Sequence, residues 1–140
     1  MENIFCFSVR IKKHKRGFIV AYLINYNDKK YYQSVKFHDK TTGPRATLLG
    51  IKEALTYIPI GSNVLLSTTD EYSKYAFGTK NLKDNAKNID VIKSIRNLLS
   101  NMNKYDCTYL YKSYFGKCID LLFHNYNDKA EQDRLEEVFK

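Results

Sequence analysis

The sequence of 140 residues has few cysteines, few acidic residues and no long apolar run, and each shortage excludes a class of protein. Its three cysteines, Cys6, Cys107 and Cys118, are an odd number without a CxxC pair, which argues against a disulfide scaffold and against a zinc site. The three histidines lack the spacing of metal ligands. No apolar stretch approaches the length that crosses a bilayer. We therefore expect a protein without structural disulfides, structural zinc or membrane spans.

The composition predicts a folded protein of one domain. Hydrophobic residues make up 44% of the chain and aromatic residues 14%, which is too apolar for a disordered chain. A chain of 140 residues can also bury a core of its own. The N-terminal stretch MENIFCFSVRIKKHKR has its apolar part before its basic part, the reverse of a secretory signal. We expect a single domain spanning residues 1–140, located in the cytoplasm, with no membrane partner.

Negative charge is scarce relative to positive charge. The chain has 23 Lys and Arg residues against 15 Asp and Glu residues, which gives a formal net charge of +8. Such an excess favours polyanionic partners, nucleic acid first. The alternative is that a composition rich in Lys, Asn, Tyr and Ile follows from an AT-rich genome. The charge by itself leaves both interpretations open.

Three β-prone stretches open the chain. NIFCFSVRI (3–11) and FIVAYLINY (18–26) are mostly apolar, and KYYQSVKF (30–37) alternates as a half-exposed strand does. The connectors KKHKRG and NDK have the composition of turns. The sequence predicts three antiparallel strands joined by hairpins.

The apolar period then changes to that of a helix. Apolar residues from Leu48 to Ile58 recur every three or four positions and form one helical face. Pro44 suits the first turn of this helix, and Pro59 with Gly61 ends it. The remaining predicted elements are a strand at 64–68, helices at 72–77 and 89–102, a strand at 107–114, and helical residues from 118 onward.

This order predicts an α/β fold with a five-stranded mixed sheet. The first three strands form an antiparallel meander, and the order α-β-α-α-β-α follows. The later strands reach the sheet through helical crossovers, so they should lie parallel to the first strand, with the helices packed on the sheet. An extra C-terminal helix at 127–140 is an open alternative.

The order of elements and the residues at their joints resemble the ribonuclease H family. RATLLGIKEAL (45–55) resembles the family's first helix, R-x-E-L-x-A-x-x-x-A-L, and LLSTTDEYSKY (65–75) resembles its fourth strand with the T-D-S-x-Y that follows. KNIDVIKSI (87–95) is similar to K-N-x-D-L, and YKSYFGKCIDLLF (111–123) to the last strand, the H-x-G loop and the D-x-L-A helix. The four matches keep the family's order and cover nearly the whole chain. The resemblance implies a ribonuclease H-like domain.

The family's chemistry is hydrolysis of a phosphodiester by two Mg²⁺ ions that four carboxylates hold. The resemblance places Asp70 at the third carboxylate and Asp120 at the fourth, and these two residues would be the catalytic and metal-binding ones. Glu71 lies beside Asp70 and is a candidate assistant. A rival alignment of the C-terminal part nominates Glu131 or Asp133 in place of Asp120.

The other two carboxylates of the family pattern are missing. The first Asp of the family falls near Phe7 here, the helix Glu falls on Thr47, and the loop His falls on Tyr114. Because Mg²⁺ requires hard oxygen ligands, we expect no tight two-metal site and no cofactor; Mg²⁺ or Mn²⁺ is the alternative. Asp70 then has a simpler interpretation as the cap of the helix that follows it.

Two groups of basic residues are candidates for contacts with nucleic-acid phosphates. One lies in the first hairpin and comprises Arg10, Lys12, Lys13, Lys15 and Arg16. The other lies around the third helix and comprises Lys80, Lys83, Lys87, Lys93 and Arg96. Tyrosines in the strands are candidate stacking platforms for bases, although ordinary sheet packing explains them equally well: Tyr31, Tyr32, Tyr109, Tyr111 and Tyr114.

Three functional hypotheses follow. The first is a catalytically degenerate ribonuclease H-like protein that binds RNA or a ribonucleoprotein without cleaving it. The second is an active metal-dependent ribonuclease with a site rebuilt around Asp70 and Asp120. The third is a small phage or mobile-element protein whose partner is another protein, for example one that inhibits a host nucleoprotein such as an RNA-guided nuclease. The oligomeric state is not predictable from the sequence.

Overall fold

The computed structural model describes residues 4–27, 29–68, 71–78, 87–109, 121 and 123–124. Its elements are, in chain order, β1 (Ile4–His14), β2 (Gly17–Tyr26), β3 (Lys29–Asp39), α1 (Gly43–Thr56), β4 (Asn63–Thr68), α2 (Glu71–Phe77), α3 (Ile89–Leu99) and β5 (Lys104–Tyr109). This is the predicted order. The described residues near the C-terminus, 121 and 123–124, are helical, and the alternative helix at 127–140 lies outside the described part.

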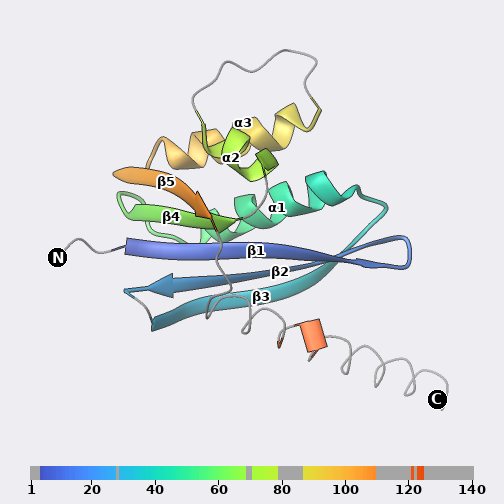
Figure 1. Ribbon diagram of the computed structural model, residues 1–140. Coiled ribbons are helices and arrows are strands. Elements are labelled where there is room, and N and C mark those ends of the chain that lie inside the picture. The colour runs from blue at the N-terminus through green and yellow to red at the C-terminus, as the bar shows by residue number, and fades with distance from the viewer. Residues whose placement is uncertain are drawn as a thin grey trace.

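All five strands belong to one sheet with the order β3-β2-β1-β4-β5 (Figure 1). β1, β2 and β3 pair antiparallel, whereas β4 pairs parallel with β1 and β5 pairs parallel with β4. Parallel neighbours need a crossover connection, which α1 supplies between β3 and β4, and α2 with α3 between β4 and β5. The predicted mixed sheet is confirmed.

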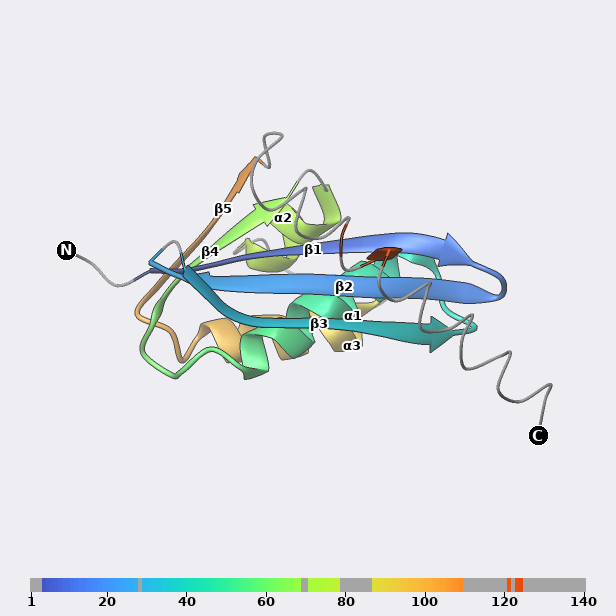
Figure 2. The same ribbon diagram turned by 90° about the horizontal axis from the view of Figure 1, so that it is seen from below.

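The three helices cover one face of the sheet. Figures 1 and 2 show α1, α2 and α3 on the same side of the strands. Alternate residues of β1, β2 and β4 point to this side and form the main core with the apolar faces of α1 and α3. On the opposite face, Ile19, Ala21 and Leu23 of β2 pack against Phe123. Because both faces of β2 are buried, its sequence FIVAYLINY is apolar almost without interruption.

Helix α1 begins and ends where its sequence indicates. Thr42 caps its N-terminus, and its hydroxyl accepts a hydrogen bond from the Arg45 amide at 3.4 Å, with Pro44 in the first turn. The face that packs on the sheet includes Leu48, Ile51 and Leu55, all buried. Gly50 also lies on this face, where its missing side chain lets the helix approach β1 and β2 closely.

Three predicted boundaries were wrong. β1 continues to His14, because the run of basic residues pairs with β2 as far as Gly17 and leaves only a two-residue turn. Lys15 in this turn has a positive φ of 52°, as tight hairpin turns require. α3 ends at Leu99, although Met102 still packs on the core. β5 begins at Lys104 and not at Cys107, and its predicted continuation beyond residue 109 lies outside the described part.

The start of β5 is set by contacts between two loops. The Gly61 amide donates to the Asn101 carbonyl at 2.8 Å, and the Asn103 amide donates to the Ser62 carbonyl at 2.9 Å. These bonds align the entry into β5 with the entry into β4, so that Asn63 lies opposite Lys104. Such long-range bonds have no signal in the local pattern of KYD, which therefore looks like a loop in the sequence.

Among the described residues, no helix is both long and apolar enough to span a bilayer.

Candidate functional site

The resemblance places the chemistry at the carboxyl end of β4 and on the part of β1 that pairs with it. The pairing runs from Ile4 opposite Asn63 to Phe7 opposite Leu66. Asp70, two residues after the end of β4, lies outside the described residues, and so does Asp120. The backbone of Glu71 begins α2, but its side chain is outside the described part. The roles of these three acids therefore stay predictions.

Phe7, which the resemblance places at the family's first aspartate, belongs to the core. Its side chain is fully buried, and its ring centroid lies 6.1 Å from that of Phe77 in α2. Ser8 is also fully buried, and its hydroxyl has no hydrogen-bond partner among the residues that the structure describes. This segment of β1 therefore offers a phenyl ring and one hydroxyl group where the family pattern has a carboxylate.

Thr47, which the resemblance places at the family's helix glutamate, is hydrogen-bonded within α1. It is buried, and its hydroxyl donates to the Gly43 carbonyl at 3.2 Å. Glu53, the next acid along the helix, forms an ion pair with Lys36 of β3. Neither residue supplies an unpaired carboxylate to the ends of β1 and β4.

These side chains do not fit a two-metal centre. Mg²⁺ and Mn²⁺ select carboxylate, carbonyl and water oxygens, whereas Phe7, Ser8 and Thr47 bring no negative charge. Among the described residues, no group of three His, Cys, Asp or Glu side chains is placed to hold a metal ion. We derive no catalytic step through a metal from this site.

Two motifs that resemble the family's are joined by an ion pair that the sequence analysis did not predict. Arg45, from the first-helix motif, donates to both carboxylate oxygens of Asp90, at 3.1 and 2.8 Å, and to the Asn88 side chain at 3.3 Å. Asn88 and Asp90 belong to the KNID motif at the start of α3. The bidentate pair ties α1 to α3. The ion pair thus gives these motif residues a role in packing α1 against α3.

The Arg45–Asp90 pair predicts an acid-dependent loss of stability. The hydrogen bonds from Arg45 lower the pKa of Asp90 to about 2, from an ordinary value of 3.8. A carboxyl whose pKa is lower in the folded state stabilises the protein above its unfolded pKa, and this contribution is lost as the pH falls from about 4 toward 2. In urea unfolding at pH 5 and at pH 2.5, we expect the wild type to lose more stability than Asp90→Asn. Equal losses of stability in the wild type and in Asp90→Asn would show that the Arg45–Asp90 pair contributes nothing to the stability of the fold.

Strand alternation divides the basic residues of the first hairpin between the two faces of the sheet. Lys13 lies on the helix side, and its ammonium group is 4.9 Å from the ring centroid of Phe18. Arg16, in the turn, lies 3.6 Å from the Asp39 carboxylate. Lys12 and Lys15 are exposed and make no ion pair with any residue that the structure describes. The tip of this hairpin reaches past the helices (Figures 1 and 2).

The second basic group is less available. Arg96 is turned toward α2, where it donates to the carbonyls of Tyr75 at 2.8 Å and Ala76 at 3.4 Å, so it has a structural role. Lys87 and Lys93 are exposed. Lys80 and Lys83 lie outside the described residues. The hairpin residues belong to the sheet and Lys93 to the helical layer, so the two predicted groups lie in different layers of the fold.

The tyrosines near the free edge of the sheet pack on other aromatic rings. Tyr32 stacks on Tyr57 with ring centroids 4.2 Å apart and an interplanar angle of 20°. Tyr31 is 47% exposed. Its ring makes an edge-to-face contact with the ring of Phe5. The side chain of Tyr109, and all of Tyr111 and Tyr114, are outside the described part. Sheet packing therefore explains Tyr32, while Tyr31 keeps an accessible ring.

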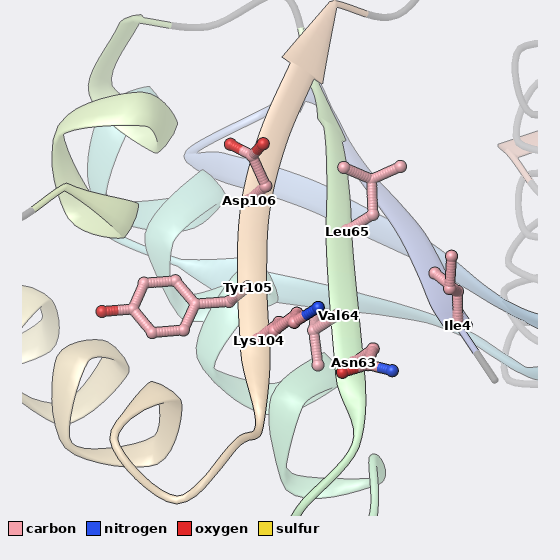
Figure 3. Close-up of a pocket in the computed structure, with 7 residues that line it drawn as sticks. All are labelled: Ile4, Asn63, Val64, Leu65, Lys104, Tyr105 and Asp106. Atoms are coloured by element: carbon pink, nitrogen blue, oxygen red, sulfur yellow. The ribbon is translucent and has the colours of Figure 1, made fainter. Parts of the chain in front are cut away.

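A shallow hollow of about 430 Å³ lies at the other end of β4 and β5 (Figure 3). Leu65 and Asp106 rise from the two strands, while Tyr105 points to the opposite side of β5, toward the helices (Figure 3). The Asp106 carboxylate accepts a hydrogen bond from the Cys107 amide at 2.7 Å. The lining residues are Ile4, Asn63, Val64, Leu65, Lys104, Tyr105 and Asp106. The hollow is at the amino ends of the two strands, away from the carboxyl end of β4, and Asp106 is the only acid among the lining residues.

The sequence matches no protein-family model and no curated protein. Solved structures do share its fold. RNase H1 from the halophilic archaeon Halobacterium salinarum is 10% identical, with a TM-score of 0.61 over 78% of this chain and 86% of that one. The N-terminal RNase H domain of a Mycobacterium tuberculosis protein, solved as a fusion with maltose-binding protein, is 11% identical, with a TM-score of 0.69 over 95% and 99%. At such low identity the likeness concerns the fold.

Proposed function

We propose that this chain, which has the ribonuclease H-like fold, binds nucleic acid without cleaving it. The nucleic acid is either free RNA or the RNA of a ribonucleoprotein. Two observations support the separation of binding from cleavage. The resemblance places two of the family's carboxylates at Phe7 and Thr47; Phe7 is fully buried, and the hydroxyl of Thr47 is bonded to its own helix. A hydrolytic site that lacks two of its four carboxylates has little attraction for a pair of divalent cations.

The first hairpin is the observation that carries the binding half of the proposal. In the described residues, Asp39, Glu53 and Asp90 each pair with a basic residue, so little negative charge remains to offset the exposed lysines. Lys15 lies in the hairpin turn and Lys12 near the end of β1, and the tip of this hairpin reaches past the helices (Figure 2). Lysines in such a place neutralise phosphates and release counterions.

The proposal is tested by binding and cleavage assays with single-stranded RNA, RNA–DNA hybrid and duplex DNA at two salt concentrations, with Mg²⁺ or Mn²⁺ present. We expect salt-sensitive binding and no cleavage. Metal-dependent cleavage that disappears in Asp70→Asn would overturn the proposal in favour of an active ribonuclease. The absence of both binding and cleavage would also overturn it and would favour a protein partner.

The position of the binding surface is tested with two double variants that change the net charge equally. We expect Lys12→Glu with Lys15→Glu to weaken binding of a single strand about tenfold and to lower the salt slope by about 1.4, because about 0.7 is lost per phosphate contact. The matched control, Lys30→Glu with Lys52→Glu, changes exposed lysines at the other end of β3 and on α1. Equal losses in the two variants would indicate unspecific attraction to the net charge.

A further inference from the structure

One row of side chains crosses the outer face of the sheet, opposite the helices. The register places Lys12 of β1 opposite Ile19 of β2, and Ile19 opposite Phe37 of β3. Ile19 points away from the helices, toward the small cluster that contains Phe123. Because cross-strand neighbours share a face, Lys12 and Phe37 also point away from the helices. The row thus carries a cation at one end and an aromatic ring at the other.

His14 adds a second ring to this face. It lies two residues after Lys12 in β1 and therefore points to the same side. β2 lies between β1 and β3, and ordinary strand spacing puts the backbones of β1 and β3 about 9.6 Å apart. The centroids of the His14 and Phe37 rings are nevertheless only 6.0 Å apart. The interplanar angle is 86°. The two side chains therefore lean toward each other across β2, and each limits the rotation of the other.

The Phe37 ring remains accessible in this arrangement. Its side chain is 38% exposed, whereas Ile19 between the strands is fully buried. Lys12 is exposed, and the Asp39 carboxylate at the end of β3 lies 3.6 Å from the Arg16 guanidinium, which offsets its negative charge. We name the set of Phe37, His14 and Lys12 the outer-face platform. It combines a partly exposed aromatic ring, in contact with a second ring, with a positive charge.

We propose that the outer-face platform stacks an unpaired base of single-stranded nucleic acid on Phe37 while Lys12 contacts a phosphate of the same strand. This inference rests on the proposed function and specifies the state of the polymer. A base in a duplex has both faces covered by its neighbours, so an aromatic ring on a sheet can use only an unpaired base. Stacking of this kind tolerates every base, because each has a π-face. The preference is therefore for single strands, without a preference for sequence.

The test compares Phe37→Ala with Tyr31→Ala. Tyr31 is a matched control, because it is another exposed aromatic residue of β3, at the opposite end of the strand and also near lysines. Its ring packs against Phe5 of the helix-side core, so it is not part of the outer-face platform and would not stack the same base. With a uridine or thymidine oligomer, we expect Phe37→Ala to weaken binding about tenfold and Tyr31→Ala to leave it within about twofold. With an abasic oligomer of the same length, wild type and Phe37→Ala should bind equally, since no base remains to stack.

Phe37→Leu separates stacking from packing. Leucine retains apolar contact with the sheet but has no π-face, so the variant should melt near the wild-type temperature and still bind the oligomer about as weakly as Phe37→Ala. Equal binding by Phe37→Ala and Tyr31→Ala, or an unchanged loss with the abasic oligomer, would overturn the platform and leave the proposed function standing. Binding of the wild type to duplex but not to single strands would also overturn the platform and leave the proposed function standing. Failure of the wild type to bind any nucleic acid would remove both proposals.

Discussion

Phe7→Asp is expected to unfold most of the protein, although it places an acid where the family pattern has one. Phe7 is fully buried between the sheet and α2, so the change removes an aromatic side chain from the core, at a cost of about 3–5 kcal/mol. It also buries a carboxylate without a partner, which adds several kcal/mol. The sum approaches the whole stability of a typical domain, about 5–15 kcal/mol. The measurement is circular dichroism during urea unfolding, with and without Mg²⁺.

The control for this variant is Phe7→Leu, which keeps an apolar side chain at the same position. We expect it to remain folded and to lose only about 1–2 kcal/mol. A folded Phe7→Asp with wild-type stability, or one that Mg²⁺ stabilises strongly, would contradict the assignment of this position to the core. It would also revive a metal site at the ends of β1 and β4.

Gly50→Val is expected to lower the free energy of unfolding by about 3 kcal/mol, through overpacking between α1 and the sheet. A Cβ atom at Gly50 would lie 2.6 Å from Cγ1 of Val9 and 2.7 Å from Cγ1 of Val20. Both contacts are with short branched side chains that are themselves buried, so the helix has to move away from the strands. A thermal melt should show a fall of about 10 °C in Tm.

Lys52→Val is the matched control, because Lys52 is exposed on the same helix and valine there tests only its lower helix propensity. We expect a change within about 0.5 kcal/mol. Gly50→Ala should fall between the two, since about 1 kcal/mol of helix propensity is gained against the same close approach. If Gly50→Val were as stable as the control, the tight contact of α1 with β1 and β2 would be wrong.

Much of the architecture could be predicted from local patterns. The helical stripe from Leu48 to Ile58 and the stop at Pro59 predicted the place of α1, and the three β-prone stretches at the start predicted the meander. The motif matches led to the ribonuclease H-like fold, which the solved structures share although the sequence matches no family model and no curated protein. The failures were boundaries that depend on partners distant in the chain, such as the start of β5 at Lys104.

The resemblance predicts that Phe7 and Thr47 stand where the family has acids, and this assignment stays a prediction. The structure adds that Phe7 fills the core and that Thr47 bonds to its own helix. The basic run of the hairpin was visible as charge. The strand register places Lys12 and Lys13 on opposite faces of the sheet. The packing of α3 on α2 places Arg96 against the carbonyl of Tyr75. Neither result could be predicted from the charge pattern.

By itself, the sequence determined the order of the elements, the mixed sheet and the excess of positive charge, because period, turn composition and charge are properties of neighbouring residues. Only the tertiary structure decided which residues meet. Arg45 reaches Asp90 across two helices, and His14 leans over β2 toward Phe37. Contacts of this kind arise from the pairing and packing of segments that lie far apart in the chain, where no local pattern records them.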